Sequence, residues 1–246
     1  MTYARDVFAF TGPDTEHFLQ GLVTNDLAGL SKGLVYAAIL TPQGKYLADF
    51  FLMQRNGTIF LDVASELADG LLTRLSMYKL RADVTIDRTD LHVHRGVGPA
   101  PEGAFDDPRH AQLGWRAYLE APQTSDTTDW DAIRVAHCIP ETGIELGPDT
   151  YILEAGFERL NGVDFRKGCY VGQEVTARMK HKTELRKGLA KVTLDGQAPI
   201  GTKISRVGKD CGVLYTQANG QAIAYLRFDR AGVGMLAGDA AVSWEA

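Results

Sequence analysis

The spacing of hydrophobic positions divides the chain into a mixed region and a region of short strands. Leucines recur at helical spacing over residues 65–77, which predicts an amphipathic helix. Apolar runs on the N-terminal side of this helix are broken by Pro-Gln-Gly and by Arg-Asn-Gly, which predict hairpin turns. After Lys187 short β segments alternate with glycines, a pattern typical of a small barrel. The sequence therefore predicts an α+β region over residues 1–185 and an all-β domain over residues 186–246.

A further helix is expected to begin near Gly172, inside the stretch DFRKGCYVGQEVTARMKHK. Cys169 would then lie just ahead of the positive helix end, with Arg166 and Lys167 beside it, and both effects favour a thiolate. Glu174 in the first turn of the helix acts in the opposite direction. From the residues alone, Cys169 is either a reactive thiol or a structural cysteine in a glycine-rich turn, since free cysteines are commonly buried and inert.

Composition narrows the class of protein. The chain has 246 residues, 45% of them hydrophobic and 23% charged, which is ordinary for a soluble globular protein. It contains no apolar run of about 18 residues and its start lacks the order of a signal peptide, so we expect a cytoplasmic protein without a membrane span. Its three cysteines are widely spaced and form no CxxC, which argues against a disulfide framework and a complete single-chain zinc site.

The charge of the chain is uneven. The net charge is −5, which argues against general coating of nucleic acid. Residues 166–187 nevertheless hold seven Lys/Arg and two Glu, a local charge of +5 that leaves −10 on the rest of the chain. This stretch indicates an anionic ligand or partner, and the alternative is a solvated helix face. Direct nucleic-acid binding is not expected.

Two other features could carry chemistry. His92 and His94 alternate on one predicted strand and could supply two metal ligands, but without a third they are more simply surface or core histidines. Asp49 lies in an otherwise apolar strand, where it is either exposed or held in a pocket. In a pocket its carboxylate could accept hydrogen bonds from an amine or a pterin-like ring. Spacing alone favours an exposed acid at a sheet edge.

The string KGCYVGQE resembles the signature of the YgfZ family of folate-binding proteins, which are relatives of the glycine-cleavage T-protein, an aminomethyltransferase. The blocks FLQGLVTNDL, LTPQGKYLADFFL, YKLRADVTI and DPRHAQLGWR resemble further blocks of the family, in the same order. The resemblance covers nearly the whole chain, and the cysteine-containing string is its most specific part.

This resemblance implies a T-protein-like fold, with two interwoven α/β domains around a central tunnel and a small C-terminal β-barrel. It also implies tetrahydrofolate in the tunnel and a monomeric protein that supports the maturation or repair of iron–sulfur clusters in client enzymes, including some that modify tRNA. Its expected partners are therefore folate and iron–sulfur client enzymes or cluster-assembly proteins. Lys167 and Cys169 match the functional hallmark of the family, and Gln173 and Glu174 match residues that shape the tunnel wall.

Asp49 keeps a second activity open, because it aligns with the aspartate that T-proteins use beside the reacting folate nitrogen. The alternative function is therefore a folate-dependent aminomethyltransferase or a related one-carbon transfer enzyme. The residues predicted to carry the chemistry are Cys169, Lys167 and Asp49. The residues predicted to contact folate are Tyr78, Arg81, Trp115, Lys167, Tyr170, Gln173 and Glu174.

Overall fold

The computed structural model describes residues 4–182 and 184–245. The chain forms two compact units, each assembled from two separate stretches: Met1–Thr128 with Glu158–Val175, and Asp129–Phe157 with Thr176–Ala246. We call these the first and the second unit. The second unit includes residues on both sides of the predicted domain boundary near residue 186. That boundary therefore stays a prediction.

The first unit is built on an antiparallel five-stranded sheet in the order β2-β3-β4-β1-β5. Its strands are β1 (Arg5–Thr11), β2 (Val35–Leu40), β3 (Tyr46–Arg55), β4 (Thr58–Ala64) and β5 (Thr85–Arg88). The predicted hairpin turns at Pro-Gln-Gly and Arg-Asn-Gly are confirmed, because they join β2 to β3 and β3 to β4.

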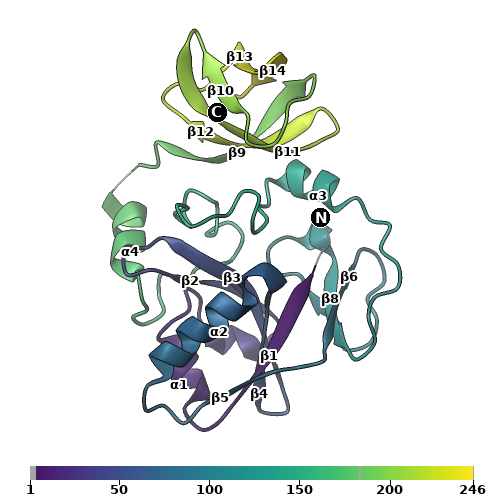
Figure 1. Cartoon of the computed structure of the whole chain (residues 1–246), viewed down its shortest axis with the longest axis vertical. Coiled ribbons are helices and arrows are strands. Elements are labelled where there is room, and N and C mark those ends of the chain that lie inside the picture. Colours follow the sequence, from purple (N-terminus) through teal and green to yellow (C-terminus); the bar gives the residue numbers. More distant parts are fainter. Residues whose placement is uncertain (1–3, 183, 246) are drawn as a thin grey trace. The chain divides into compact units, whose positions relative to one another are not determined.

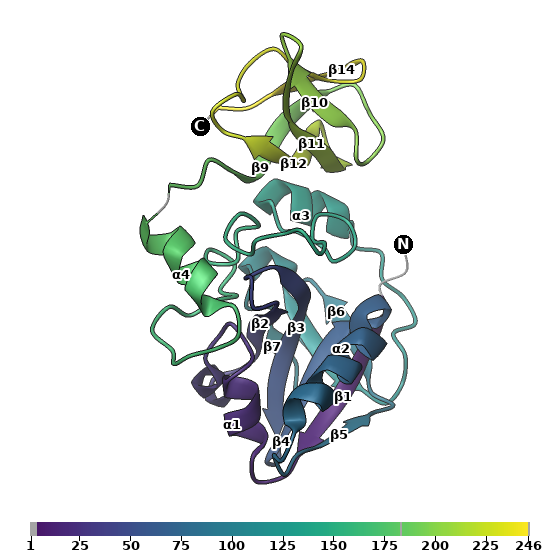
Figure 2. The ribbon, with the colours of Figure 1, turned by 60° about the vertical axis from the view of Figure 1, so that its left-hand side comes forward.

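The two faces of this sheet differ in chemistry. On one face Phe50 and Leu52 of β3 pack in an apolar core with residues of helices α1 (Thr15–Gln20) and α2 (Ser65–Lys79). Figures 1 and 2 show the two helices beside the sheet. The alternate residues of β3, which include Asp49 and Phe51, point to the other face. Strand β3 is therefore buried on both faces, and its residues Tyr46–Met53 are apolar except for Asp49 rather than alternating between apolar and polar.

A smaller sheet completes the first unit. It has the order β6-β8-β7, with β6 (His92–Gly96), β7 (Phe105–Asp106) and β8 (Trp115–Leu119). Two short 3₁₀ helices, Leu27–Ser31 and Ala111–Leu113, lie in the connections.

The second unit contains a closed six-stranded barrel in the order β10-β11-β12-β9-β14-β13. Its strands are β9 (Lys187–Asp195), β10 (Lys203–Arg206), β11 (Lys209–Ala218), β12 (Gln221–Arg227), β13 (Met235–Ala237) and β14 (Ala240–Ser243). Ile204, Leu214 and Met235 fill its interior. Closure leaves no open sheet edge, and the predicted barrel is confirmed.

Two more helices complete the described structure. Helix α3 (Trp130–His137) belongs to the second unit, and α4 (Gln173–Lys182) begins directly after Gly172 as the sequence predicted. None of the described helices has both the length and the apolar character that crossing a membrane requires.

Candidate functional site

The exposed thiol of Cys169 lies in the irregular segment that precedes α4. Gly172 ends this segment with a φ of 85°, and a Cβ atom there would come within 2.5 Å of the Thr41 carbonyl oxygen. Only glycine combines this conformation with so close an approach. The β2–β3 turn therefore fixes one end of the cysteine segment.

Lys167 fixes the other end. Its Nζ donates hydrogen bonds to the carbonyl oxygens of Gln20 (2.8 Å), Val23 (2.5 Å) and Asn25 (3.0 Å). An ammonium group has three donors, so these carbonyls engage all of them. Burial lowers the pKa of Lys167 to about 8, with Asp26 acting in the opposite direction, so the charged form predominates at neutral pH.

Further hydrogen bonds join the same two parts of the chain. The Thr24 hydroxyl donates to the Gly162 carbonyl oxygen (2.7 Å), and Asn25 Nδ2 donates to the Asn161 carbonyl oxygen (2.7 Å). The Asp164 backbone N–H donates to the Thr24 carbonyl oxygen (3.1 Å). The cysteine segment is thus bound to residues 20–25, which precede it by about 140 positions along the sequence.

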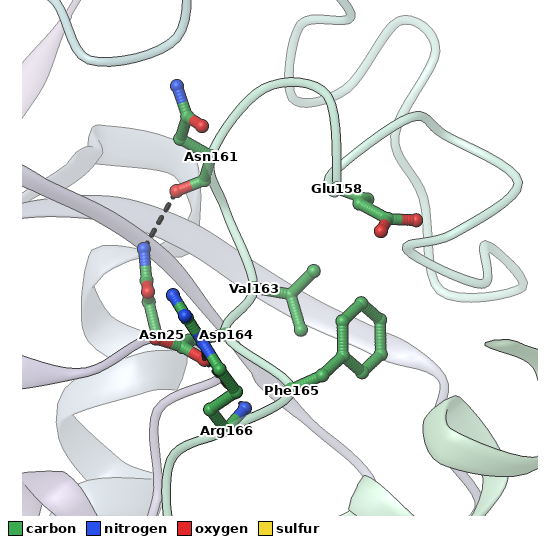
Figure 3. Close-up of a pocket in the computed structure, with 7 residues that line it drawn as sticks. All are labelled: Asn25, Glu158, Asn161, Val163, Asp164, Phe165 and Arg166. Atoms are coloured by element: carbon green, nitrogen blue, oxygen red, sulfur yellow. Dashed lines mark hydrogen bonds and ion pairs between the residues drawn. The ribbon is translucent and has the colours of Figure 1, made fainter. Parts of the chain in front are cut away.

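A pocket of about 420 Å³ lies beside this junction. Figure 3 shows Val163 and Phe165 extending from the segment that leads to Cys169, and Glu158 on the loop above them. Asn25, Asn161, Asp164 and Arg166 complete its lining, and the Asn25–Asn161 hydrogen bond crosses one border. The size is that of a small-molecule site, but two carboxylates and one guanidinium in the lining do not select one class of ligand.

Asp49 is buried, with 4% of its surface exposed, so the expectation of an exposed edge acid is wrong. Its two carboxylate oxygens accept hydrogen bonds from the hydroxyls of Tyr36 (3.0 Å) and Tyr46 (2.6 Å). Burial first, and then the charge of Asp49, raise the pKa of Tyr36 well above its ordinary value. Tyr36 therefore remains a hydrogen-bond donor, and the two tyrosine hydroxyls fix the orientation of the Asp49 carboxylate.

An ionic network on the same sheet face was not foreseen from the sequence. Asp62 of β4 accepts hydrogen bonds from Arg5, Arg116 (2.6 Å) and the Tyr118 hydroxyl (3.0 Å). Burial alone would raise the pKa of Asp62, but the charges of Arg5 and Arg116 outweigh it and hold that pKa below its ordinary value. The network lies under Phe51, whose ring centroid is 3.9 Å from the Arg116 guanidinium carbon.

A second carboxylate extends this network. Asp107 pairs with Arg109 (2.8 Å) and lies 3.6 Å from Arg116. The Arg109 guanidinium lies over the ring of Tyr36, which in turn donates to Asp49. Residues of the block DPRHAQLGWR thus support the tyrosine that orients Asp49, and the only signal in the sequence was the resemblance of that block to the family.

The other predicted site residues lie on several elements of the first unit. Tyr170 is beside Lys167, with 5.3 Å between its ring centroid and Nζ, and its backbone N–H donates to Gln173 Oε1 (2.9 Å). Glu174 is exposed in the first turn of α4. The structure thus places Lys167 and Tyr170 on the cysteine segment, and Gln173 and Glu174 in the first turn of α4 directly after it.

Three residues predicted to contact folate lie elsewhere. Tyr78 and Arg81 are at the C-terminal end of α2, where Tyr78 is half-buried against the core and Arg81 is exposed. Trp115 begins β8, and its ring covers Gly96, where a Cβ atom would come within 2.5 Å of it. The roles of all these residues stay predictions.

The residues that the structure describes include no group of three or more His, Cys, Asp and Glu side chains able to hold a metal ion. The ring of His94 contacts the Ala121 carbonyl oxygen at 2.7 Å, and His92 is exposed.

Comparison with known proteins defines the class. Residues 186–246 match the family model described as "CAF17, C-terminal beta-barrel domain". The fold is similar to the glycine cleavage system aminomethyltransferase T from Bartonella henselae, with a TM-score of 0.80, 14% identity, and coverage of 98% of this chain and 83% of that one. The chain thus has the fold of the T-protein class, as expected.

Sequence relatives identify the family. The iron–sulfur cluster assembly factor IBA57 of Mus musculus, a mitochondrial protein, is 32% identical over 91% of this chain and 72% of its own length. The human protein is 29% identical over 94% of this chain and 74% of its own length. The homologue from Mycosarcoma maydis is 32% identical over 74% of this chain and 54% of its own, so the chain spans about half of that relative. This chain belongs to the IBA57 family of iron–sulfur cluster assembly factors.

Two expectations are corrected by these relatives. The broader family is confirmed, but the relatives carry the name IBA57 rather than YgfZ. The expected cytoplasmic location is wrong, because the relatives are named as mitochondrial proteins.

Proposed function

We propose that this protein supports the assembly or repair of iron–sulfur clusters in client enzymes, including some that modify tRNA, and that Cys169 is the thiol that meets a cluster, a persulfide or the client. The observation that carries the proposal is an exposed cysteine on a segment held at both ends, in a member of a family of cluster assembly factors. The partners are client enzymes or other assembly proteins.

The other two cysteines do not compete for this role. Cys211 is buried inside the barrel, and Cys138 is half-buried at the end of α3 in a left-handed conformation. An iron–sulfur cluster is normally held by about four protein ligands. The supporting observation is that no further ligand cluster occurs among the described residues, so the cluster would be shared with or passed to another protein.

The test is complementation of a deletion strain. Cys169→Ser is expected to leave the cluster enzymes at the activity of the deletion strain, because a hydroxyl replaces the sulfur ligand, whereas Cys138→Ser is expected to restore them. Activity of a client enzyme, normalised to the amount of each variant, is the readout. Full restoration by Cys169→Ser would show that the thiol is structural.

Tetrahydrofolate is the ligand proposed for the same protein. Asp49 favours it, because a buried carboxylate held by two tyrosine hydroxyls is a pre-oriented acceptor for ring N–H donors. Lys167 has its three donors on backbone carbonyls, so its predicted role as a folate contact has less support.

Folate binding is tested by titrating tetrahydrofolate and following tryptophan fluorescence. A saturable response is expected, with affinity about tenfold weaker in Asp49→Asn because a charged acceptor is lost. Absence of a saturable response in the unmodified protein would remove the claim. Turnover of an aminomethyl donor by the same samples would decide in favour of the one-carbon transferase alternative.

A further inference from the structure

Three hairpins of the structure share one kind of turn. Two-residue loops join β3 to β4, β10 to β11, and β11 to β12, and both loop residues have positive φ in each. Two of these loops are Asn-Gly, with φ of 52° and 81° at residues 56–57 and of 52° and 70° at residues 219–220. These are the residues that such a turn favours, since asparagine and glycine tolerate the left-handed region.

The β10–β11 loop breaks this rule. Val207 occupies the position of the two asparagines with a φ of 49°, followed by Gly208 with a φ of 73°. A β-branched residue is strained in this conformation. The side chain is 94% exposed, so packing within the protein does not offset the strain. A strained and exposed apolar residue at a turn tip indicates a role outside the folding of this chain.

Two more exposed apolar residues lie on, or just before, the strand β13 that pairs with β10. Strand β10 pairs with β13 so that Ser205 faces Leu236, which is 49% exposed on the outside of the barrel. Val207 lies two residues after Ser205, and Val233, which is 66% exposed, lies three residues before Leu236. In this antiparallel pair both positions extend beyond the same end of the ladder. We call Val207, Val233 and Leu236 the barrel-end patch.

The border of the barrel-end patch is basic. Arg206 and Lys209 flank the turn directly and are exposed. Gly232, next to Val233, lies against the Arg206 guanidinium, since a Cβ atom there would be 3.1 Å from Nη1. Around this end of the barrel the basic residues Arg206, Lys209, Arg227 and Arg230 outnumber the acidic residues Asp210, Asp229 and Glu245. A protein with a net charge of −5 therefore presents apolar side chains within a positive border here.

We propose that the barrel-end patch is a docking surface for an acidic face of the iron–sulfur client protein, with Val207 as its apolar anchor. The inference rests on the proposed function, because it assigns the surface to the same client. Apolar anchors within a polar border are typical of protein interfaces, and the basic border favours an acidic partner. A second copy of this chain fits less well, because a two-fold contact would place the same cations opposite each other.

The first test is stability. Val207→Asn gives the turn the residue found in the other two hairpins and is expected to raise the melting temperature by about 2–4 °C. Ile200→Asn is the control, because Ile200 is also an exposed apolar residue of the barrel domain and precedes the opposite end of β10. The control is expected to leave the melting temperature unchanged.

The second test is binding of the apo form of the client enzyme that loses activity in the deletion strain. Val207→Asn and Arg206→Glu are each expected to weaken this binding about tenfold, and Ile200→Asn is expected to leave it unchanged. Added salt is expected to weaken binding of the unmodified protein and to have less effect on Arg206→Glu. A variant that is more stable and yet binds less well cannot be explained by misfolding.

Three results would overturn the proposal. In the first, the unmodified chain and Val207→Asn bind the client equally well. In the second, the unmodified chain does not bind the client. In the third, the unmodified chain self-associates in ultracentrifugation and Val207→Asn does not. The last result would assign the surface to a second copy. Loss of client activity in Cys169→Ser together with full activity in Val207→Asn would leave the proposed function standing and reject this surface alone.

Discussion

Replacing Asp62 by asparagine is expected to lower the free energy of unfolding by about 3–5 kcal/mol. Asp62 is the shared partner of Arg5 and Arg116, and all three side chains are buried. The substitution removes the negative charge and leaves two buried guanidinium groups without their main carboxylate. Breaking one side of a buried ion pair costs this much because the remaining charge stays buried without its nearest counter-charge, and Asp107 at 3.6 Å compensates Arg116 only in part.

Chemical denaturation measures this effect, and Asp69→Asn is the matched control. Asp69 also pairs with an arginine, Arg88, but its side chain is 90% exposed, so its loss is expected to cost about 0–1 kcal/mol. A cost for Asp62→Asn as small as that of the control would contradict the role given to the buried network.

The same network predicts acid sensitivity. The pKa of Asp62 is lower in the folded protein than its ordinary value of about 4. Its contribution to stability is therefore fully present above that ordinary value and is lost as the pH falls through the lowered folded pKa. Asp62→Asn is expected to lose less stability than the unmodified protein between neutral and acidic pH.

Replacing Lys167 by methionine is expected to release the cysteine segment. Three carbonyl oxygens would lose their donor, at a cost of about 1–3 kcal/mol in the free energy of local opening. Amide hydrogen exchange in residues 20–25 and 161–172 would become about tenfold to a hundredfold faster. Client activity is expected to fall with it, because Cys169 would no longer be held in place.

Lys167→Arg is expected to fail as a replacement, since a planar guanidinium cannot converge on three carbonyls as an ammonium does. Lys182→Met is the control, because Lys182 is an exposed lysine of α4. Unchanged exchange in Lys167→Met would show that the three hydrogen bonds do not hold the segment.

Patterns within short stretches of sequence correctly predicted the turns, the helix start and the strands whose formation depends on neighbouring residues. The two hairpin turns, the start of α4 after Gly172 and the succession of short barrel strands all followed from residues close together in the sequence. The burial of Asp49 did not, because β3 is covered on both faces and its sequence does not show that neither face meets solvent.

Contacts across long sequence separations also escaped prediction. Asp62 and Arg116 are 54 residues apart, and Lys167 reaches carbonyls 142–147 residues away. Lys167 was predicted to contact folate because it matches the functional hallmark of the family. Its hydrogen-bond acceptors are backbone carbonyl oxygens, which every type of residue has, so the sequence does not identify them.

The most direct test of the central claim, that the Cys169 thiol serves cluster delivery, is recovery of a purified apo-client supplied with iron, sulfide and this protein. The unmodified protein is expected to speed recovery of client activity. Cys169→Ser is expected to give only the rate measured with no protein added. Equal acceleration by the two proteins, or no acceleration by either, would contradict the account.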